Sequence, residues 1–243
     1  MTQYLHHLGT IAEGFPDPNT ALTQPDGLLA IGGCLSVQRL SQAYQNGIFP
    51  WYSEGEPLMW WSPSERAIID LQHFHASKSL RKSAKRLRPR ITINTCFADV
   101  IASCKEQRMY TEGTWITDAM QYAYIKAHQE GLAHSVEVWV DDQLAGGLYG
   151  IMQSRVFCGE SMFHRVTDCS KLAMWALVEF LKQHNAAFID CQLMNPYLCQ
   201  LGATALPRHE FLAKLKNNST QAYDLSFWQK SELENPYGPT LTN

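Results

Sequence analysis

Two acidic residues lie in segments that are otherwise apolar or small, which is unusual for a carboxylate. Glu160 lies within residues 157–163 and Asp190 within residues 189–192, and each position is typical of the end of a strand. An unpaired buried charge is costly, so a carboxylate in such surroundings must be paired or hydrogen-bonded. Two of them, with Gln192 next to Asp190, indicate a site rather than a detail of the fold.

The chemistry open to these groups is that of an amine or a cation. Asp190 can hold or deprotonate an amine while Gln192 positions the same group; the alternative is a structural Asp that caps a helix or loop. Glu160 suits recognition of a cation, and the neighbouring Gly159 would let a ligand approach closely. The alternative for Glu160 is a buried ion pair with an arginine.

Covalent and cofactor chemistry have little support in the sequence. Cys191 and Ser161 lie in no Gly-x-Ser-x-Gly elbow and have no histidine close by in the chain. The glycine-rich nucleotide motifs and His-Glu-x-x-His are missing, and the nine histidines are scattered. We therefore expect no metal and no cofactor. A reaction without a cofactor needs a substrate that is already activated.

Positive charge is concentrated in one segment of an otherwise acidic chain. Residues 78–90 hold 7 of the 20 Lys and Arg residues and no acid, while the whole chain has a net charge of −3. Such a run is the footprint of a polyanion-binding surface, although a solvated helix face is an equal alternative. Tryptophans could stack on bases, and Trp115, flanked by Gly and Thr, is the better candidate.

Composition indicates a globular protein rather than a disordered or membrane one. The 243 residues are 45% hydrophobic and 18% charged, and no apolar run approaches the ~20 residues of a membrane span. The first residues lack the features of a signal peptide. Seven cysteines without Cys-x-x-Cys pairs fit reduced thiols. We expect a cytoplasmic protein.

The chain divides into two predicted domains. Residues 1–62, rich in Pro, Gly and aromatics, predict a small, largely irregular N-terminal α/β domain with one helix at 36–46. The remainder, 63–243, alternates helix and strand patterns and ends in an irregular tail after about residue 228. Helices are expected at 74–85, 97–105, 118–130, 170–184 and 210–216, and strands at 90–94, 135–140, 144–152, 155–159 and 187–191. The predicted class is α+β.

Taken together, ordered segments resemble the bacterial leucyl/phenylalanyl-tRNA protein transferases. No single segment is decisive, but the set is specific because it runs in order over nearly the whole chain. The matching segments are 27–33, 44–51, 60–63, 112–117, 134–139, 146–150, 157–163, 170–171 and 189–192. Leu148 stands where many relatives carry Met, a swap that roughly conserves volume.

The resemblance implies a fold and an activity. The fold is a small N-terminal domain followed by a GNAT-like domain with a mixed, largely antiparallel sheet flanked by helices. The activity moves Leu or Phe, and less well Met, from aminoacyl-tRNA to an N-terminal Arg or Lys of a protein, which marks that protein for N-degron degradation. The ester is already activated, so no cofactor is needed. A monomer is expected.

The resemblance also implies roles for individual residues. Asp190 draws a proton from the attacking amine with Gln192 as relay or positioner, and Glu160 contacts the acceptor's cationic side chain or its amine. The aminoacyl-adenosine end of the tRNA would be held by Trp51, Trp115, Tyr44, Tyr124, Gly159 and Ser161. The tRNA phosphates would be held by Lys78, Arg81, Lys82, Lys85 and Arg86.

Two other functions stay open at this point. One is a GNAT acyltransferase that uses acyl-CoA, although the usual pyrophosphate-binding loop is not evident after the predicted meander. The other is an RNA-binding module without turnover, built on residues 78–90.

Overall fold

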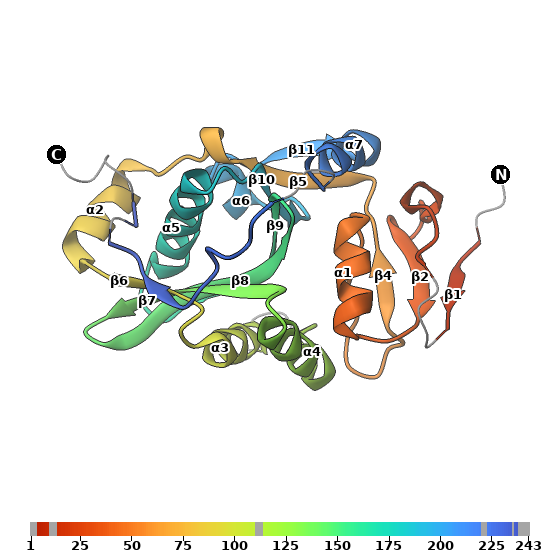
Figure 1. The fold of residues 1–243 in the computed structure, drawn as a ribbon, viewed down its shortest axis with the longest axis horizontal. Helices are drawn as coiled ribbons and strands as arrows, with labels where there is room; N and C mark the ends of the chain where they lie inside the picture. Colours follow the sequence, from red (N-terminus) through yellow and green to blue (C-terminus); the bar gives the residue numbers. More distant parts are fainter. Residues whose placement is uncertain (1–3, 10–13, 110–113, 220–222, 235, 238–243) are drawn as a thin grey trace.

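The computed structural model describes residues 4–9, 14–109, 114–219, 223–234 and 236–237. Within these residues the chain forms two sheets (Figure 1). The smaller sheet has the strand order β1-β2-β4-β3, with β1 and β2 parallel and the other pairs antiparallel. Its strands are β1 (His6–Leu8), β2 (Leu28–Gly32), β3 (Phe49–Pro50) and β4 (Met59–Trp61), and helix α1 (Val37–Gln45) accompanies it.

Helix α1 forms where the sequence predicted it. The Ser36 hydroxyl accepts a hydrogen bond from the Arg39 amide and caps the first turn. Leu40 and Ala43 are fully buried on one face of the helix. The N-terminal region is less irregular than expected, because it contains four strands in the described residues, each two to five residues long. Strands this short show too little alternation to be read from sequence.

The larger sheet has the order β11-β5-β10-β9-β8-β7-β6-β12 in the described residues. All its neighbours are antiparallel except β9 and β10, which are parallel. The strands are β5 (Glu65–Asp70), β6 (Arg90–Ile93), β7 (Ala133–Val140), β8 (Gln143–Gln153), β9 (Val156–His164), β10 (Phe188–Gln192), β11 (Thr204–Pro207) and β12 (Ser231–Glu232). The helices are α2 (Lys78–Leu87), α3 (Phe97–Met109), α4 (Asp118–Gln129), α5 (Cys169–Gln183), α6 (Pro196–Gln200) and α7 (Arg208–Ser219).

Helices cover both faces of this sheet, which confirms the predicted α+β class. Helix α5 packs on β7, β8 and β9 with α2 beside it, and α3 and α4 cover the other face (Figure 1). The two faces have separate apolar cores, and the core under α3 and α4 continues into α1 and α7. Helix α2 begins at Lys78, four residues later than predicted, because Ser77 caps it and a short 3₁₀ turn precedes it.

The chain leaves the smaller sheet at Trp61, where β4 ends, and enters the larger sheet at Glu65, where β5 begins. The division into domains at residue 62 stays a prediction. The C-terminal tail contains the short strand β12, and before it Trp228 is buried against the ring of His134 at 4.3 Å between centroids.

Glu160 and Asp190 are not at strand ends, so that expectation was wrong. Each lies inside its strand, next to a β-bulge. In the β8–β9 pair, Tyr149 faces Ser161 and Gly150 faces Gly159, so Glu160 is the extra, unpaired residue. Cys191 is the extra residue of β10 against β5. Bulges re-aim side chains and are frequent beside active sites.

Gly150 is required by the first bulge. A Cβ atom at this position would lie 2.2 Å from the carbonyl oxygen of Cys158 and 2.6 Å from the ring of Phe157. We expect Gly150→Ala to lower the free energy of unfolding by roughly 1–3 kcal/mol, the usual cost of overpacking a core, measured by urea denaturation. The control is Gly14→Ala, where a Cβ would meet nothing within 4 Å. Equal stability of the two variants would contradict the account of the bulge.

Candidate active site

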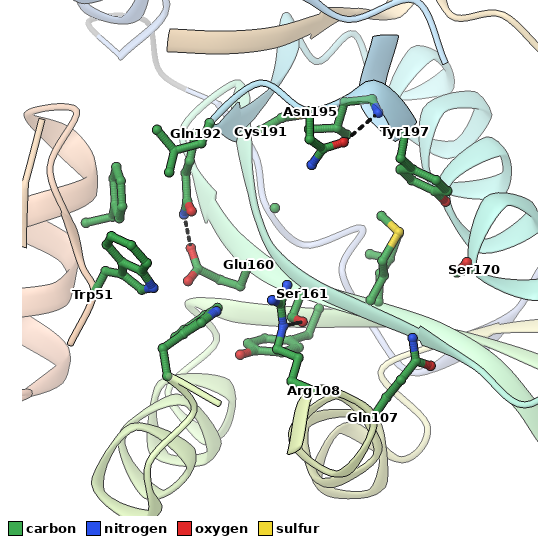
Figure 2. Close-up of a pocket in the computed structure, with 18 of the residues that line it drawn as sticks. Trp51, Gln107, Arg108, Glu160, Ser161, Ser170, Cys191, Gln192, Asn195 and Tyr197 are labelled. Atoms are coloured by element: carbon green, nitrogen blue, oxygen red, sulfur yellow. Dashed lines mark hydrogen bonds between the residues drawn. The ribbon is translucent and has the colours of Figure 1, made fainter. Parts of the chain in front are cut away.

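A cavity of about 1090 Å³ opens beside the two bulges (Figure 2). It is bounded by Trp51 after β3, by the end of α3, by β8 and β9, and by the chain that follows β10. The β9–β10 pairing ends at Asp190 and Cys158, while β9 runs on to His164. The two strands therefore cease to pair where the cavity lies. The predicted site residues that line it are Trp51, Trp115, Gly159, Glu160, Ser161 and Gln192.

Glu160 presents a buried carboxyl group to this cavity. It is 7% exposed and accepts hydrogen bonds from three side chains. The Tyr44 hydroxyl donates at 2.7 Å and the Gln192 amide at 2.8 Å to Oε1, and the Tyr124 hydroxyl donates at 2.9 Å to Oε2. Desolvation outweighs these donors and raises the pKa of Glu160 to about 7. Its ion pairing with an arginine, the alternative given above, is not what the structure shows.

Tyr44 and Tyr124 lie behind Glu160 rather than on the cavity wall. Both are almost completely buried, on α1 and α4, and their hydroxyls also contact each other. Burial raises the pKa of both phenols well above the ordinary value, so both keep their protons. In this arrangement they act on a ligand through Glu160. Their direct contact with the adenosine stays a prediction.

Asp190 is held by a buried arginine that sequence reasoning missed. Arg66 of β5 donates from Nε to Oδ1 at 2.8 Å and from Nη2 to Oδ2 at 2.7 Å, and both side chains are 1% exposed. Two parallel donors of this kind make a strong and geometrically specific pair. Arg66 lies in no recognisable sequence motif. Its role becomes visible only when the fold places β5 next to β10 and the side chain meets Asp190. Asp190 itself does not line the cavity.

Gln192 joins the two carboxylates. Its backbone amide donates to Asp190 Oδ1 at 3.0 Å, and its side-chain amide reaches Glu160. The backbone has a φ of 63°, in the left-handed region that costs a non-glycine residue about 1–3 kcal/mol. The bulge at Cys191 and the hold on Asp190 maintain this conformation. Figure 2 shows Gln192 above Glu160 with the hydrogen bond between them.

The rest of the cavity wall combines apolar side chains and aromatic rings. Leu148, Phe157 and Met174 form an apolar part of this wall. Trp51 is 40% exposed, and its ring lies edge to face with Trp61 at 5.5 Å. The guanidinium of Arg108 lies 5.5 Å from the Trp115 ring, and its Nε donates to Ser161 Oγ at 2.9 Å. Residues 112–113 of the Trp115 motif lie outside the described residues.

Gly159 leaves open space in the wall. A Cβ there would have its nearest neighbour, the Asp190 carbonyl oxygen, at 3.8 Å. The fold therefore tolerates a side chain at this position, in contrast to Gly150, and the gap is available to a ligand.

The two cysteines near the site are poor nucleophiles. Cys191 lines the cavity and Cys158 is buried beneath it. Desolvation raises the pKa of both thiols above the ordinary value, so neither forms a thiolate near neutral pH. All seven cysteines lie in described residues and are free thiols.

Helix α2 carries the basic segment. Lys78, Lys82, Lys85 and Arg86 are exposed, as a polyanion-binding surface requires. Arg81 differs: its guanidinium lies 5.3 Å from the Trp175 ring, and its Nε donates to the Ala76 carbonyl. The helix connects to the site region through the Ser83 hydroxyl, which donates to Asp168 at the start of α5.

Within the described residues, no group of three or more His, Cys, Asp or Glu side chains is arranged to hold a metal ion. Among the described helices, none combines the length and apolar character needed to cross a bilayer.

Comparison with known proteins gives the class of the enzyme and then its family. Curated relatives that match over nearly the whole chain are transferases, so the cavity belongs to a group-transfer enzyme. The model of the leucyl/phenylalanyl-tRNA protein transferase family matches residues 68–216, and that of its N-terminal domain matches residues 33–64. The chain belongs to this family of aminoacyltransferases, which confirms the resemblance.

The relatives are similar along their full length. The leucyl/phenylalanyl-tRNA protein transferase of Pseudoalteromonas translucida (strain TAC 125) is 60% identical over 98% of this chain and 100% of its own. That of Pseudoalteromonas atlantica (strain T6c / ATCC BAA-1087) is 53% identical over 91% of this chain and 95% of its own. Among solved structures, L-PGS from Bacillus licheniformis covers 69% of this chain and 53% of its own, with 11% identity and a TM-score of 0.40, too distant to indicate a function.

The raised pKa of Glu160 has a consequence for stability. A carboxyl whose folded pKa lies above its unfolded value stabilises the fold most at low pH, and this contribution is lost as pH rises through about 7. We expect Glu160→Gln to match the wild type near pH 4, below the unfolded pKa, and to exceed it near pH 8, by up to about 3 kcal/mol. Thermal unfolding across this pH range measures the difference. Exposed Glu130→Gln is the control, and parallel curves for wild type and Glu160→Gln would contradict the assignment.

Proposed function

We propose that this protein transfers Leu or Phe, and less well Met, from aminoacyl-tRNA to proteins whose N-terminal residue is Arg or Lys, and that the product enters the bacterial N-degron pathway. The observation that carries the proposal is a single cavity lined by a buried carboxyl group, that of Glu160, by aromatic rings such as Trp51 and Trp115, and by apolar side chains. Aminoacyl-tRNA is made in the cytoplasm, so we place the reaction there, in a monomer.

The donor end of the tRNA would enter beside the tryptophans. Base stacking on an aromatic ring suits any adenosine and contributes about 1–3 kcal/mol, and Trp51 is exposed enough to offer its ring. The aminoacyl side chain would then lie along Leu148 and Met174. An apolar pocket separates similar side chains by only about 1–3 kcal/mol per methylene, which supports acceptance of Leu, Phe and, less well, Met.

The acceptor amine would meet Glu160 and Gln192. Both line the cavity, and the Gln192 side-chain nitrogen lies 2.8 Å from Glu160 Oε1. The role of Asp190 as direct proton acceptor stays a prediction. Its contacts favour an indirect role, in which Asp190 positions Gln192. Asp190 holds the Gln192 backbone while both its own oxygens bind Arg66.

The test of the proposal is transfer itself. Leucyl-tRNA with a labelled leucine is incubated with a peptide that begins with Arg, and the peptide is analysed for label. Peptides that begin with Lys and with Glu define the acceptor preference, and acetyl-CoA replaces the tRNA in a parallel reaction. We expect label on the Arg and Lys peptides only. RNA binding without label on any peptide, or acetylation that needs no tRNA, would contradict the proposal.

The basic face of α2 should act on tRNA affinity and not on the chemistry. Neutralising Lys82, Lys85 and Arg86 together should weaken leucyl-tRNA and phenylalanyl-tRNA binding alike. The slope of log affinity against log salt should flatten by roughly 0.7–0.9 per lost phosphate contact. Titrations at several salt concentrations measure this. A donor reduced to aminoacylated adenosine is the control, because it lacks the stem and should react as before. Unchanged tRNA affinity would show that the face is only solvated.

Direct transfer predicts that no aminoacyl group is held on cysteine. The double variant Cys158→Ala, Cys191→Ala should keep much of the wild-type transfer rate, because both thiols are protonated at neutral pH. Single-turnover kinetics give the rate. Mass-spectrometric detection of an aminoacyl group on Cys191 would overturn the direct mechanism.

A further inference from the structure

The hydrogen bonds around Glu160 form a closed ring with a place for one more proton. Three oxygen–oxygen contacts join it: Tyr44 to Glu160 at 2.7 Å, Tyr124 to Glu160 at 2.9 Å, and Tyr44 to Tyr124 at 2.5 Å. With an ionised carboxylate, the two phenols supply only two hydrogens for these three contacts. A proton on the carboxyl completes the ring, because each of the three groups then donates to the next.

Asp190 is in the opposite situation. Both its oxygens accept from Arg66, Oδ1 also accepts from the Gln192 backbone, and the residue is 1% exposed. Protonating it would strand the buried guanidinium as an unpaired charge, which is strongly destabilising. Its electrostatic role is to remain an anion.

We propose that Glu160, closed into a ring by Tyr44 and Tyr124, takes the proton from the acceptor's α-ammonium group, and that Asp190 does not. The inference rests on the proposed function and names the proton acceptor of that reaction. Glu160 lines the cavity, whereas the two tyrosines behind it do not, so the substrate reaches the ring only through this carboxyl.

The reaction is an aminolysis of the aminoacyl ester. One proton passes from R–NH₃⁺ to the Glu160 carboxylate, and the freed electron pair of the amine attacks the ester carbonyl carbon to form the C–N bond. The tetrahedral intermediate then expels the ribose oxygen as the C–O bond breaks, and the second amine proton ends on that oxygen. Glu160 returns its proton to solvent through the cavity. Each turnover releases one proton, one amide and one tRNA with a free ribose hydroxyl.

The groups packed around Glu160 tune it for this exchange. They come from five elements other than its own strand: Tyr44 of α1, Tyr124 of α4, Tyr149 of β8, Arg66 of β5, and Asp190 with Gln192 of β10. Burial and the charge of Asp190 favour the protonated carboxyl, while the phenols and Arg66 favour the ionised form. The resulting pKa of about 7 is close to the ~7.7–8.0 of a free α-amine, as efficient proton transfer requires.

The experiment is the pH dependence of single-turnover transfer at saturating acceptor, with aminoacylated adenosine as donor and an Arg-initiated peptide as acceptor. Donor hydrolysis is followed in parallel at each pH. In Glu160→Gln the amine must already be neutral before it attacks. Because Glu160 with a pKa of about 7 is itself only partly ionised at pH 6.5, the variant should be slower than wild type by roughly 4- to 8-fold at pH 6.5 and by less than about threefold at pH 9. The same loss at both pH values would show that Glu160 only binds the acceptor, and would overturn the proposal.

Tyr124→Phe provides a second test that keeps the carboxyl in place. The phenol stabilises the ionised form of Glu160, so its removal should raise the pKa of that carboxyl and move the acidic limb of the rate profile to higher pH. A limb that stays at the wild-type pH would overturn the proposal. The control is Tyr122→Phe, an exposed tyrosine on the same helix, which should leave the profile unchanged. Wild-type protein with no transfer at any pH would refute the proposed function itself, whereas transfer with an unaltered profile refutes only this inference.

Discussion

The buried pair of Arg66 and Asp190 is the interaction on which the rest of the structure depends. Arg66 Nη1 donates to the Gly47 carbonyl at 3.1 Å, and the guanidinium lies 4.7 Å from the rings of both Phe49 and Phe211. One side chain thus joins the segment after α1, strand β3, helix α7 and strand β10. A buried ion pair is seldom a large net source of stability. Its value here is geometric, because it fixes Asp190 and, through the Gln192 backbone, the groups that face the cavity.

The two bulges complete this arrangement. The one on β9 leaves Glu160 without a partner on β8, and the one at Cys191 lets β10 leave the sheet. The local strain at Gln192 is retained because its amide groups contact both carboxylates. The outcome is two carboxyl groups that differ in charge: one held as an anion by Arg66, the other buried among phenols with its pKa raised. Because the two neighbouring carboxyl groups have different environments, they can have different tasks: Asp190 positions Gln192, and Glu160 is suited to proton transfer.

Local signals in the sequence were enough for much of the fold. The capping residue Ser36 marked the start of α1, and the sequence pattern revealed the central strands β7 and β8. Strand β5 was missed because its buried residues are flanked by charges, and the N-terminal strands are too short to show a period. In the site, the apolar and small residues around the acidic groups at 157–163 and 189–192 already indicated Glu160 and Gln192, which line the cavity. Arg66 and the ring formed by Tyr44 and Tyr124 depend on contacts between distant segments, which no single sequence displays.

The central claim, that the Arg66–Asp190 pair positions the site, is tested most directly by replacing the pair with apolar side chains. The double variant Arg66→Met, Asp190→Leu removes both charges together, so neither is left unpaired, and such replacements often preserve or increase stability. Circular dichroism and tRNA titration report whether the variant folds and binds its donor, and single-turnover transfer reports the site. The account predicts a folded protein that binds tRNA as the wild type does and transfers at least ~100-fold more slowly, the lower end of what a positioned proton acceptor contributes. Transfer within about threefold of wild type would contradict it.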